Sequence, residues 1–228
     1  MPKHIIIDLF GGVGGAARGY QQAGFHVVSV DIAPQPDSCA DEFVQADLSS
    51  LDPGGPIRVW DRLVELADAW HASPPCQASS ALTKGTNFGR SYPQMIPATR
   101  RFLAMTGKPW VIENVAGAPI RKDLMLCGEM FGLGVIRHRF FECDGFKVPT
   151  IAHVPHRGRV AGMRHGQWFT GPYFAVYGEG GGKGTVKEWR DAMGIDWTWE
   201  RKSIAEAIPP AYTQCIGTSI FTHLRGRS

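Results

Sequence analysis

A cysteine and a glutamate each follow a short apolar run, in settings that suit covalent chemistry. Cys76 comes after a Pro-Pro pair that ends the apolar run 69–72, and the fixed φ angles of the prolines would hold its thiol in a defined place. Glu113 follows the apolar run 110–112. A fixed thiol is a candidate nucleophile, and a carboxyl group beside it is a candidate acid. The simpler alternatives are a buried structural cysteine and a carboxylate that caps a turn.

A glycine-rich turn follows the first apolar run of the chain. Gly12, Gly14 and Ala17 have the spacing of a dinucleotide-type loop, and Asp31 ends the next apolar run. Glycine lets the backbone approach a ligand closely, and the carboxylate can accept hydrogen bonds from ribose hydroxyl groups. The pattern fits a nicotinamide, flavin or S-adenosylmethionine site, and it also fits a tight strand-to-helix turn without a ligand.

These residues need a scaffold, and the sequence predicts alternating strands and helices as far as about residue 115. Apolar runs predict strands at 5–10, 25–30, 43–46, 69–72 and 110–112, and apolar spacing of three and four residues predicts helices at 16–23, 57–66 and 96–105. The alternation predicts a doubly wound, mostly parallel α/β sheet, which binds ligands beyond the carboxyl ends of its strands. Polar residues are expected to gather at that edge, namely Asp8, Asp31, Asp47, the turn 73–76 and Glu113.

Composition limits the class of protein. The chain has 228 residues, of which 43% are hydrophobic and 20% charged, and this predicts one large domain or one domain with a small appended part. Five cysteines without a C-x-x-C pair argue against a disulfide framework or a zinc ribbon. No apolar run approaches the length of a transmembrane helix, so we expect a cytoplasmic protein without membrane contact. The net charge is +3, and the basic excess in the last third suits a segment that faces a polyanion.

Residues 145–203 differ from the rest because their apolar periodicity weakens, which predicts a separate small region. The core of this region is predicted to contain its four tryptophans, Trp168, Trp189, Trp197 and Trp199. His153 and His156, taken with His165 and Cys143, match no standard zinc spacing. We therefore expect no metal site.

Five motifs occur in the order and spacing of one protein family. They are Asp8-Leu9-Phe10-Gly11-Gly12-Val13-Gly14-Gly15, Pro74-Pro75-Cys76-Gln77, Glu113-Asn114-Val115, Arg137-His138-Arg139 and Gln214-Cys215-Ile216-Gly217. The chain thus resembles the DNA (cytosine-5)-methyltransferases over residues 4 to about 142 and again over about 204–224. The resemblance implies a Rossmann-like methyltransferase fold in a compact member of phage or stand-alone type. Residues 1–144 and 204–228 would form the catalytic domain, and 145–203 a small target-recognition region.

The resemblance also implies the chemistry. Cys76 would attack C6 of a cytosine flipped out of double-stranded DNA, Glu113 would hydrogen-bond the ring near N3, and Arg139 would contact O2. Arg137 matches the neighbouring arginine of the same motif, and both arginines would favour a thiolate at Cys76. C5 would then take the methyl group of S-adenosylmethionine and leave S-adenosylhomocysteine. The cofactor residues implied are Asp8, Phe10, Gly12, Gly14, Asp31, Ile32, Asp47, Pro74 and Thr218. Three positions depart from the family pattern, namely Gly11 for a common cysteine, Val135 for a usual glutamine and Thr218 for a usual asparagine.

DNA contacts are expected from two segments. The polar stretch 78–90 would close over the flipped base, and basic residues of 145–203 would bind phosphates. The residues expected to face DNA are Gln77, Ser79, Ser80, Lys84, Arg90, Arg157, Arg159, Arg164, Lys183 and Lys187. Because each base pair read in the major groove needs its own side chain, the small region predicts a target of roughly two to four base pairs.

Two other functions share these features. A tRNA cytosine-5 methyltransferase is one, since some relatives of the family act on tRNA. A catalytically silent DNA-binding protein on the same fold is the other, although the presence of Cys76, Glu113 and Arg139 argues against it. The chain is expected to act as a monomer in a bacterial or phage-infected cell, and the sequence neither indicates nor excludes a restriction partner.

Overall fold

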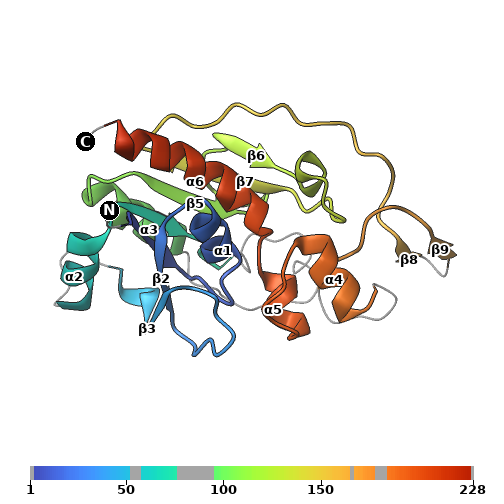
Figure 1. Cartoon of the computed structure of the whole chain (residues 1–228), viewed down its shortest axis with the longest axis horizontal. Coiled ribbons are helices and arrows are strands. Elements are labelled where there is room, and N and C mark those ends of the chain that lie inside the picture. The colour runs from blue at the N-terminus through green and yellow to red at the C-terminus, as the bar shows by residue number, and fades with distance from the viewer. Residues whose placement is uncertain (1–2, 52–57, 76–94, 165–166, 178–183, 227–228) are drawn as a thin grey trace.

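The fold was analysed in a computed structural model, which describes residues 3–51, 58–75, 95–164, 167–177 and 184–226 (Figure 1). In these residues, seven strands form one sheet: β1 Ile5–Leu9, β2 His26–Asp31, β3 Glu42–Gln45, β4 Ala69–Ala72, β5 Trp110–Asn114, β6 Leu124–Leu126 and β7 Arg139–Asp144. Their order is β3-β2-β1-β4-β5-β7-β6. The first five run parallel, whereas β7 is antiparallel to both β5 and β6. The predicted doubly wound, mostly parallel sheet is therefore confirmed.

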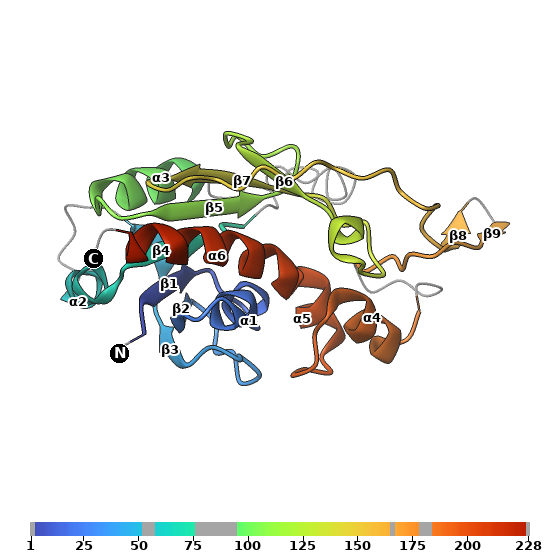
Figure 2. The same cartoon turned by 45° about the horizontal axis from the view of Figure 1, so that its top comes forward.

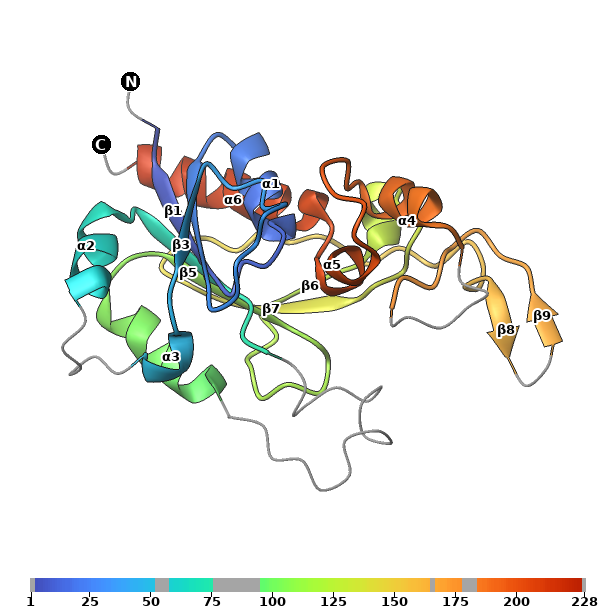
Figure 3. The same cartoon turned by 90° about the horizontal axis from the view of Figure 1, so that it is seen from below.

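Helices cover both faces of the sheet. The α-helices are α1 Gly15–Gln22, α2 Arg58–Leu66, α3 Met95–Met105, α4 Val186–Met193, α5 Arg201–Glu206 and α6 Pro210–Arg225, and the short 3₁₀ turns are η1 Leu48–Ser50 and η2 Gly128–Phe131. Helices α1 and α6 lie on one side of the sheet, and α2 and α3 lie on the other (Figure 3). In the described part of the chain, none of these helices combines the length and apolar character needed to cross a bilayer.

The apolar runs read from the sequence explain the two cores. In a strand, successive side chains point to opposite faces, so Ile6 packs under α1 and α6 while Ile7 packs under α2 and α3. A sheet buried on both faces needs continuous apolar strands, which is why the runs were recognisable. Glu113 differs from expectation, because it lies inside β5 instead of beyond its end, whereas Asp8 lies inside β1, within the strand predicted at 5–10.

A third core belongs to the small region at the end of the sheet, where α4 and α5 pack together (Figure 2). Helix α4 begins at a capping box, in which the Thr185 side chain accepts from the Glu188 N–H and the Glu188 side chain accepts from the Thr185 N–H. This core also includes Val135, from the loop that leads into β7. A two-stranded hairpin, β8 Gly162–Arg164 and β9 Gln167–Phe169, follows an extended connection that leaves β7 (Figure 1).

The prediction for the four tryptophans was half right. Trp189 is fully buried, and Trp197 packs partly buried against the same core. Trp168 and Trp199, however, are 54% and 63% exposed. Trp199 instead stacks against Arg190, whose guanidinium carbon lies 3.6 Å from the ring centroid. Apolar composition alone cannot tell a core tryptophan from one that stacks on a surface arginine.

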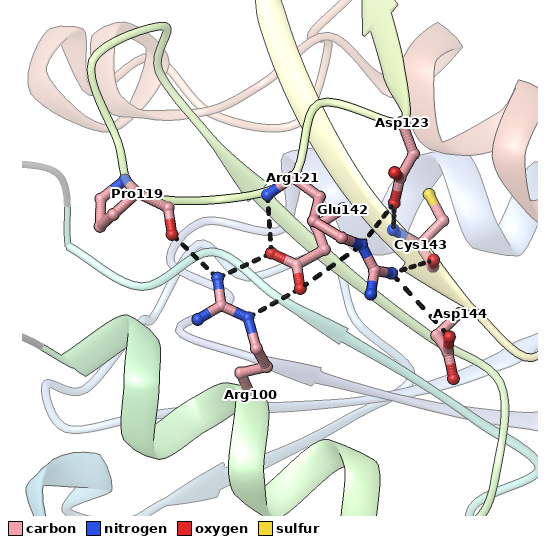
Figure 4. Close-up of polar contacts among 7 residues, drawn as sticks. All are labelled: Arg100, Pro119, Arg121, Asp123, Glu142, Cys143 and Asp144. Carbon is pink, nitrogen blue, oxygen red and sulfur yellow. Dashed lines mark hydrogen bonds and ion pairs between the residues drawn. The ribbon is translucent and has the colours of Figure 1, made fainter.

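A buried carboxylate ties α3 to the antiparallel edge of the sheet (Figure 4). Glu142 in β7 is fully buried, and the guanidinium of Arg100 donates to both of its oxygens, at 2.7 and 2.8 Å. The backbone N–H of Arg121 also donates to Glu142, at 3.1 Å, and the Arg121 side chain reaches Asp123 and the carbonyl of Cys143. A buried charge held by this many donors fixes the position of β7 relative to α3.

Removing the main partner of this carboxylate should destabilise the fold. Arg100→Met leaves Glu142 buried with too few donors, so we expect a loss of about 3 kcal/mol in the free energy of unfolding. Urea unfolding followed by circular dichroism measures it. Lys187→Met is the matched control, because its ion pair with Asp191 is exposed and should contribute less than about 0.5 kcal/mol. Equal losses for the two variants would contradict the structural importance of Glu142.

Candidate active site

The turn after β1 exposes backbone at the carboxyl edge of the sheet. Gly14 caps α1 in the left-handed region, at φ 93°, and Phe10 adopts φ 61°, which is unusual for a residue other than glycine. Asp31, at the end of β2, accepts from the Gly12 N–H at 3.0 Å and from the Ala33 N–H at 3.1 Å. A β-carbon on Gly12 would meet no atom within 4 Å. The turn is therefore held by a carboxylate and is open to a ligand.

Asp8 lies beside this turn and is completely buried. Neither of its carboxylate oxygens has a hydrogen-bond partner among the described residues. Burial, with smaller contributions from the charges of Asp31 and Glu113, raises the pKa of Asp8 to about 8. A β-carbon on Gly11 would lie 2.0 Å from Ser29 Oγ and 3.0 Å from an Asp8 oxygen, which explains why glycine stands where the family commonly has cysteine.

The predicted cofactor residues near this turn form a varied set of ligand groups. The apolar side chain of Ile32 is 60% exposed, directly after Asp31. Asp47 is exposed and accepts from the Ser49 N–H at 2.8 Å, and this hydrogen bond lowers its pKa. An exposed apolar surface, the hydrogen-bonded carboxyl groups of Asp31 and Asp47, and an unpartnered buried carboxyl group suit a ligand with an aromatic ring, hydroxyl groups and an amino group. These residues therefore fit S-adenosylmethionine.

Glu113 and Arg139 form a buried ion pair next to this edge, with Arg139 Nε 2.9 Å from Glu113 Oε1. Strand direction explains the pairing: because β7 runs antiparallel to β5, its first residue lies at the carboxyl end of β5, where Asn114 pairs with Phe140. Burial raises the pKa of Glu113. Arg139, Arg137 and a hydrogen bond from Ser73 lower it, but by a smaller amount than burial raises it. The net result is a carboxyl group whose pKa lies above its usual value.

A chain of buried polar groups leads to Glu113 from the other side. Tyr20 Oη lies 2.9 Å from His71 Nδ1, and His71 Nε2 lies 3.0 Å from Ser73 Oγ. Burial lowers the pKa of His71 to about 3, so its ring is neutral. A neutral ring that accepts from Tyr20 can donate to Ser73, whose hydroxyl then donates to Glu113. Ser73 lies in the turn that the sequence placed at this edge, whereas His71 was missed, although a histidine inside the apolar run before the Pro-Pro turn was a visible signal.

The turn that precedes Cys76 is fixed by Asn114. Its side-chain amide is buried and donates to the carbonyl of Pro74 at 2.9 Å. Pro74 therefore lies next to the strand that carries Glu113. Eight residues named from the sequence lie outside the described residues: Cys76, Gln77, Ser79, Ser80, Lys84, Arg90, His165 and Lys183.

Arg137 differs from its predicted role at the substrate. Its guanidinium donates to the backbone carbonyls of Val176, Ala205 and Ala207, at 2.8, 2.6 and 2.7 Å. Its own carbonyl accepts from the Tyr212 hydroxyl at 2.8 Å, and its φ of 31° is in the left-handed region. Arg137 thus fastens the small region to the segment that presents Arg139, which makes it a positioning residue.

Thr218 is not brought to the other cofactor residues. It is exposed on α6, and its hydroxyl donates to the carbonyl of Gln214. The neighbouring Gly217 packs on Ala23, after the far end of α1, whereas the open turn precedes α1. The eight residues of α1 separate the two places by about 12 Å.

The described DNA-facing candidates lie in or beside the small region. Arg157 pairs with Glu129, at 2.6 Å between Nε and Oε1, and Arg159 lies over the ring of Phe169. Lys187 is exposed on α4, and Arg164 ends β8. Arg157 and Lys187 have carboxylate partners, so a phosphate would have to compete for them.

Two sequence comparisons bear on this site. The family model described as C-5 cytosine-specific DNA methylase matches residues 5–123, which include the open turn, the Pro-Pro-Cys turn and Glu113. Among curated proteins, no sequence matches this chain.

Solved structures share the fold over nearly the whole chain. One is a candidate DNA modification methyltransferase encoded within a prophage (E. coli), with TM-score 0.65 and 14% identity, covering 97% of this chain and 99% of that one. The Entamoeba histolytica methyltransferase EhMeth has TM-score 0.65 and 13% identity, covering 98% and 99%. The S. pombe Dnmt2 methyltransferase has TM-score 0.60 and 12% identity, covering 99% and 100%. At these identities the likeness establishes the fold.

The buried carboxyl group of Asp8 should leave a signature in the pH dependence of stability. Its pKa is about 8 in the folded protein, against 3.8 for an aspartate exposed to water, so the folded protein holds a proton that the unfolded chain has released. The free energy of unfolding therefore falls as pH rises through this window. Asp8→Asn should remove this fall, so the variant gains stability relative to the wild type between about pH 6.5 and about pH 8.5.

Urea unfolding of both proteins at each pH measures the difference. The lowered pKa of His71 makes the free energy of unfolding rise with pH, but only below 6.5, the pKa of a histidine exposed to water, which is outside this window. Asp47→Asn is the control, since the lowered pKa of Asp47 places its contribution at acid pH. A difference between Asp8→Asn and wild type that stays constant with pH would contradict the protonated state of Asp8.

Proposed function

The chain belongs to the C-5 cytosine-specific DNA methylase family, and we propose that it transfers a methyl group from S-adenosylmethionine to C5 of cytosine in double-stranded DNA, within a short sequence context. The observation that carries this proposal is the buried Glu113–Arg139 pair. It lies beside the turn that leads to Cys76 and near the open turn after β1.

The proposed nucleophile is Cys76. Its thiolate would add to C6 of a flipped cytosine and form an S–C6 bond, which breaks the aromaticity of the ring and makes C5 nucleophilic. When bound, S-adenosylmethionine would supply an electrophilic methyl group. After methylation, a base would remove the C5 proton and the S–C6 bond would break, which returns Cys76 to its thiolate.

Glu113 would balance the charge of this addition. Electron density moves toward N3 when the thiolate adds to C6, and a protonated Glu113 could donate to N3 there. Arg139 would contact O2 of the base while its Nε stays paired with Glu113. Ser73 and Asn114 support these roles, because they hold Glu113 and the turn before Cys76 in place.

The small region would supply recognition of the DNA. It has its own core, it contains exposed basic side chains such as Lys187, and Arg137 fastens it to the segment before β7. Such a small region offers few side chains to the major groove, which supports a target of roughly two to four base pairs.

Base-resolution methylation sequencing tests the proposal. Plasmid DNA from a methylation-free bacterial host that expresses the wild type should carry methylcytosine in one short context. Cys76→Ala should abolish this signal, while Cys215→Ala, at a half-buried cysteine of α6, should retain it. A six-base consensus would reject the short target, and methylation of tRNA in place of duplex DNA would reject DNA as the substrate.

The covalent step has its own test. In duplex DNA that contains 5-fluorocytosine, the C5 proton is replaced by fluorine, so the adduct could form but not be released. Wild type and Cys215→Ala should then give a protein–DNA band that resists denaturation, and Cys76→Ala should give none. Glu113→Gln should lower turnover by a factor of roughly 10² or more, because an amide cannot donate the carboxyl proton. An adduct formed by Cys76→Ala would refute this nucleophile.

A further inference from the structure

Four side chains from two distant parts of the chain meet at one point outside the candidate active site. They are Cys127, His138, His153 and His156, and their ligand atoms all lie within 4.8 Å of one another. His153 Nε2 lies 3.1 Å from His138 Nε2 and 3.2 Å from His156 Nε2, and Cys127 Sγ lies 3.4 Å from His156 Nε2. We propose that these four residues bind a structural zinc ion.

Hydrogen bonds between the imidazoles explain this arrangement poorly. An imidazole nitrogen offers one proton or one lone pair in the plane of the ring, so it can make one well-aligned hydrogen bond. His153 Nε2 nevertheless has two nitrogen neighbours at hydrogen-bond distance. If the three nitrogens point their lone pairs at one cation, all of them are satisfied together.

Three of the six spacings match a tetrahedral zinc ion. Zn–N bonds of about 2.05 Å and a Zn–S bond of about 2.3 Å place neighbouring nitrogens about 3.3 Å apart and sulfur about 3.6 Å from nitrogen. The contacts of 3.1, 3.2 and 3.4 Å are close to these values, and the other three pairs of ligand atoms lie within 4.8 Å, a distance that small side-chain movements can shorten. One thiolate with three imidazoles favours Zn²⁺ over Mg²⁺ or Ca²⁺, which prefer oxygen ligands. Four protein ligands fill the coordination shell, which is typical of structural zinc.

The fold brings the ligands together in two pairs. In the antiparallel ladder of β6 and β7, Leu126 pairs with Arg139, so Cys127 and His138 are the next facing positions. The other pair, His153 and His156, lies on the extended connection between β7 and β8. This connection is held nearby by Arg157, whose N–H donates to the Tyr173 hydroxyl and whose guanidinium pairs with Glu129. Zinc would thus cross-link the connection to the sheet.

This set of ligands differs from the one considered in the sequence. Cys143, considered there, lies inside β7, where its N–H donates to Asp123. Neither Cys127 nor His138 was considered as a ligand there, and His138 entered only as part of the Arg137-His138-Arg139 motif. A zinc ion bound by His138 would fix the backbone between Arg137 and Arg139.

Metal content of the purified, untagged full chain tests the site. We expect roughly one zinc ion per chain by mass spectrometry of the metal. A Cys127→Ser, His153→Gln double variant should lose it, and His26→Gln, at a histidine paired with Glu42 on the sheet edge, should retain it. Chelation should lower the melting temperature of wild type and of His26→Gln, but leave that of the double variant unchanged.

Cobalt tests the geometry and the sulfur ligand directly. Co²⁺ added to the chelated wild type should give intense visible absorption bands of a tetrahedral site and a sulfur-to-cobalt charge-transfer band in the near ultraviolet. The single variant Cys127→Ser should lose the charge-transfer band, and Cys143→Ser should keep it. Zinc at the same level in the double variant, or a cobalt spectrum unchanged by Cys127→Ser, would overturn the proposal, and so would a wild type that binds neither metal.

Discussion

Three carboxyl groups meet at the carboxyl edge of the sheet, and much of the surrounding structure compensates their charge. Asp8, Asp31 and Glu113 come from β1, β2 and β5, and their mutual repulsion adds to the cost of burial. The chain meets this cost differently at each position. Asp31 accepts two backbone N–H groups, Glu113 pairs with Arg139, and Asp8 keeps its proton because no donor reaches it within the described residues. The three carboxyl groups therefore lie in three different electrostatic environments, and Asp8 is the one that holds its proton at neutral pH.

The antiparallel edge of the sheet supplies the positive charge that this arrangement needs. In a parallel strand next to β5, a residue at the start would lie at the opposite edge, far from Glu113. By reversing direction, β7 brings Arg139 to the carboxyl edge at its first residue. The buried network around Glu142 then holds β7 against α3, so the position of the arginine depends on contacts made further along the same strand.

The sequence predicted well what depends on local pattern. Five parallel strands and the helices between them were found because a sheet covered on both faces needs unbroken apolar runs. Features that depend on distant partners were not found. The carbonyls bound by Arg137 lie between 39 and 70 residues away, and the ligands near His138 come from a strand end and an extended connection. No fixed spacing marks such groupings, since loops of any length can produce the same contact.

The indole N–H of Trp197 donates to the carbonyl of Val13 at 2.8 Å, and the Thr198 hydroxyl donates to Asp37 at 2.7 Å. Val13 lies inside the open turn after β1, so the small region is hydrogen-bonded to the backbone that would touch a bound nucleoside. A ligand that changes the shape of this turn must also change the free energy of that contact. If binding at the turn alters the affinity of the small region for a macromolecule, thermodynamic reciprocity requires that the macromolecule alter the affinity for the nucleoside by the same factor. The hydrogen bonds of Trp197 and Thr198 are the contacts through which the two binding equilibria would be linked.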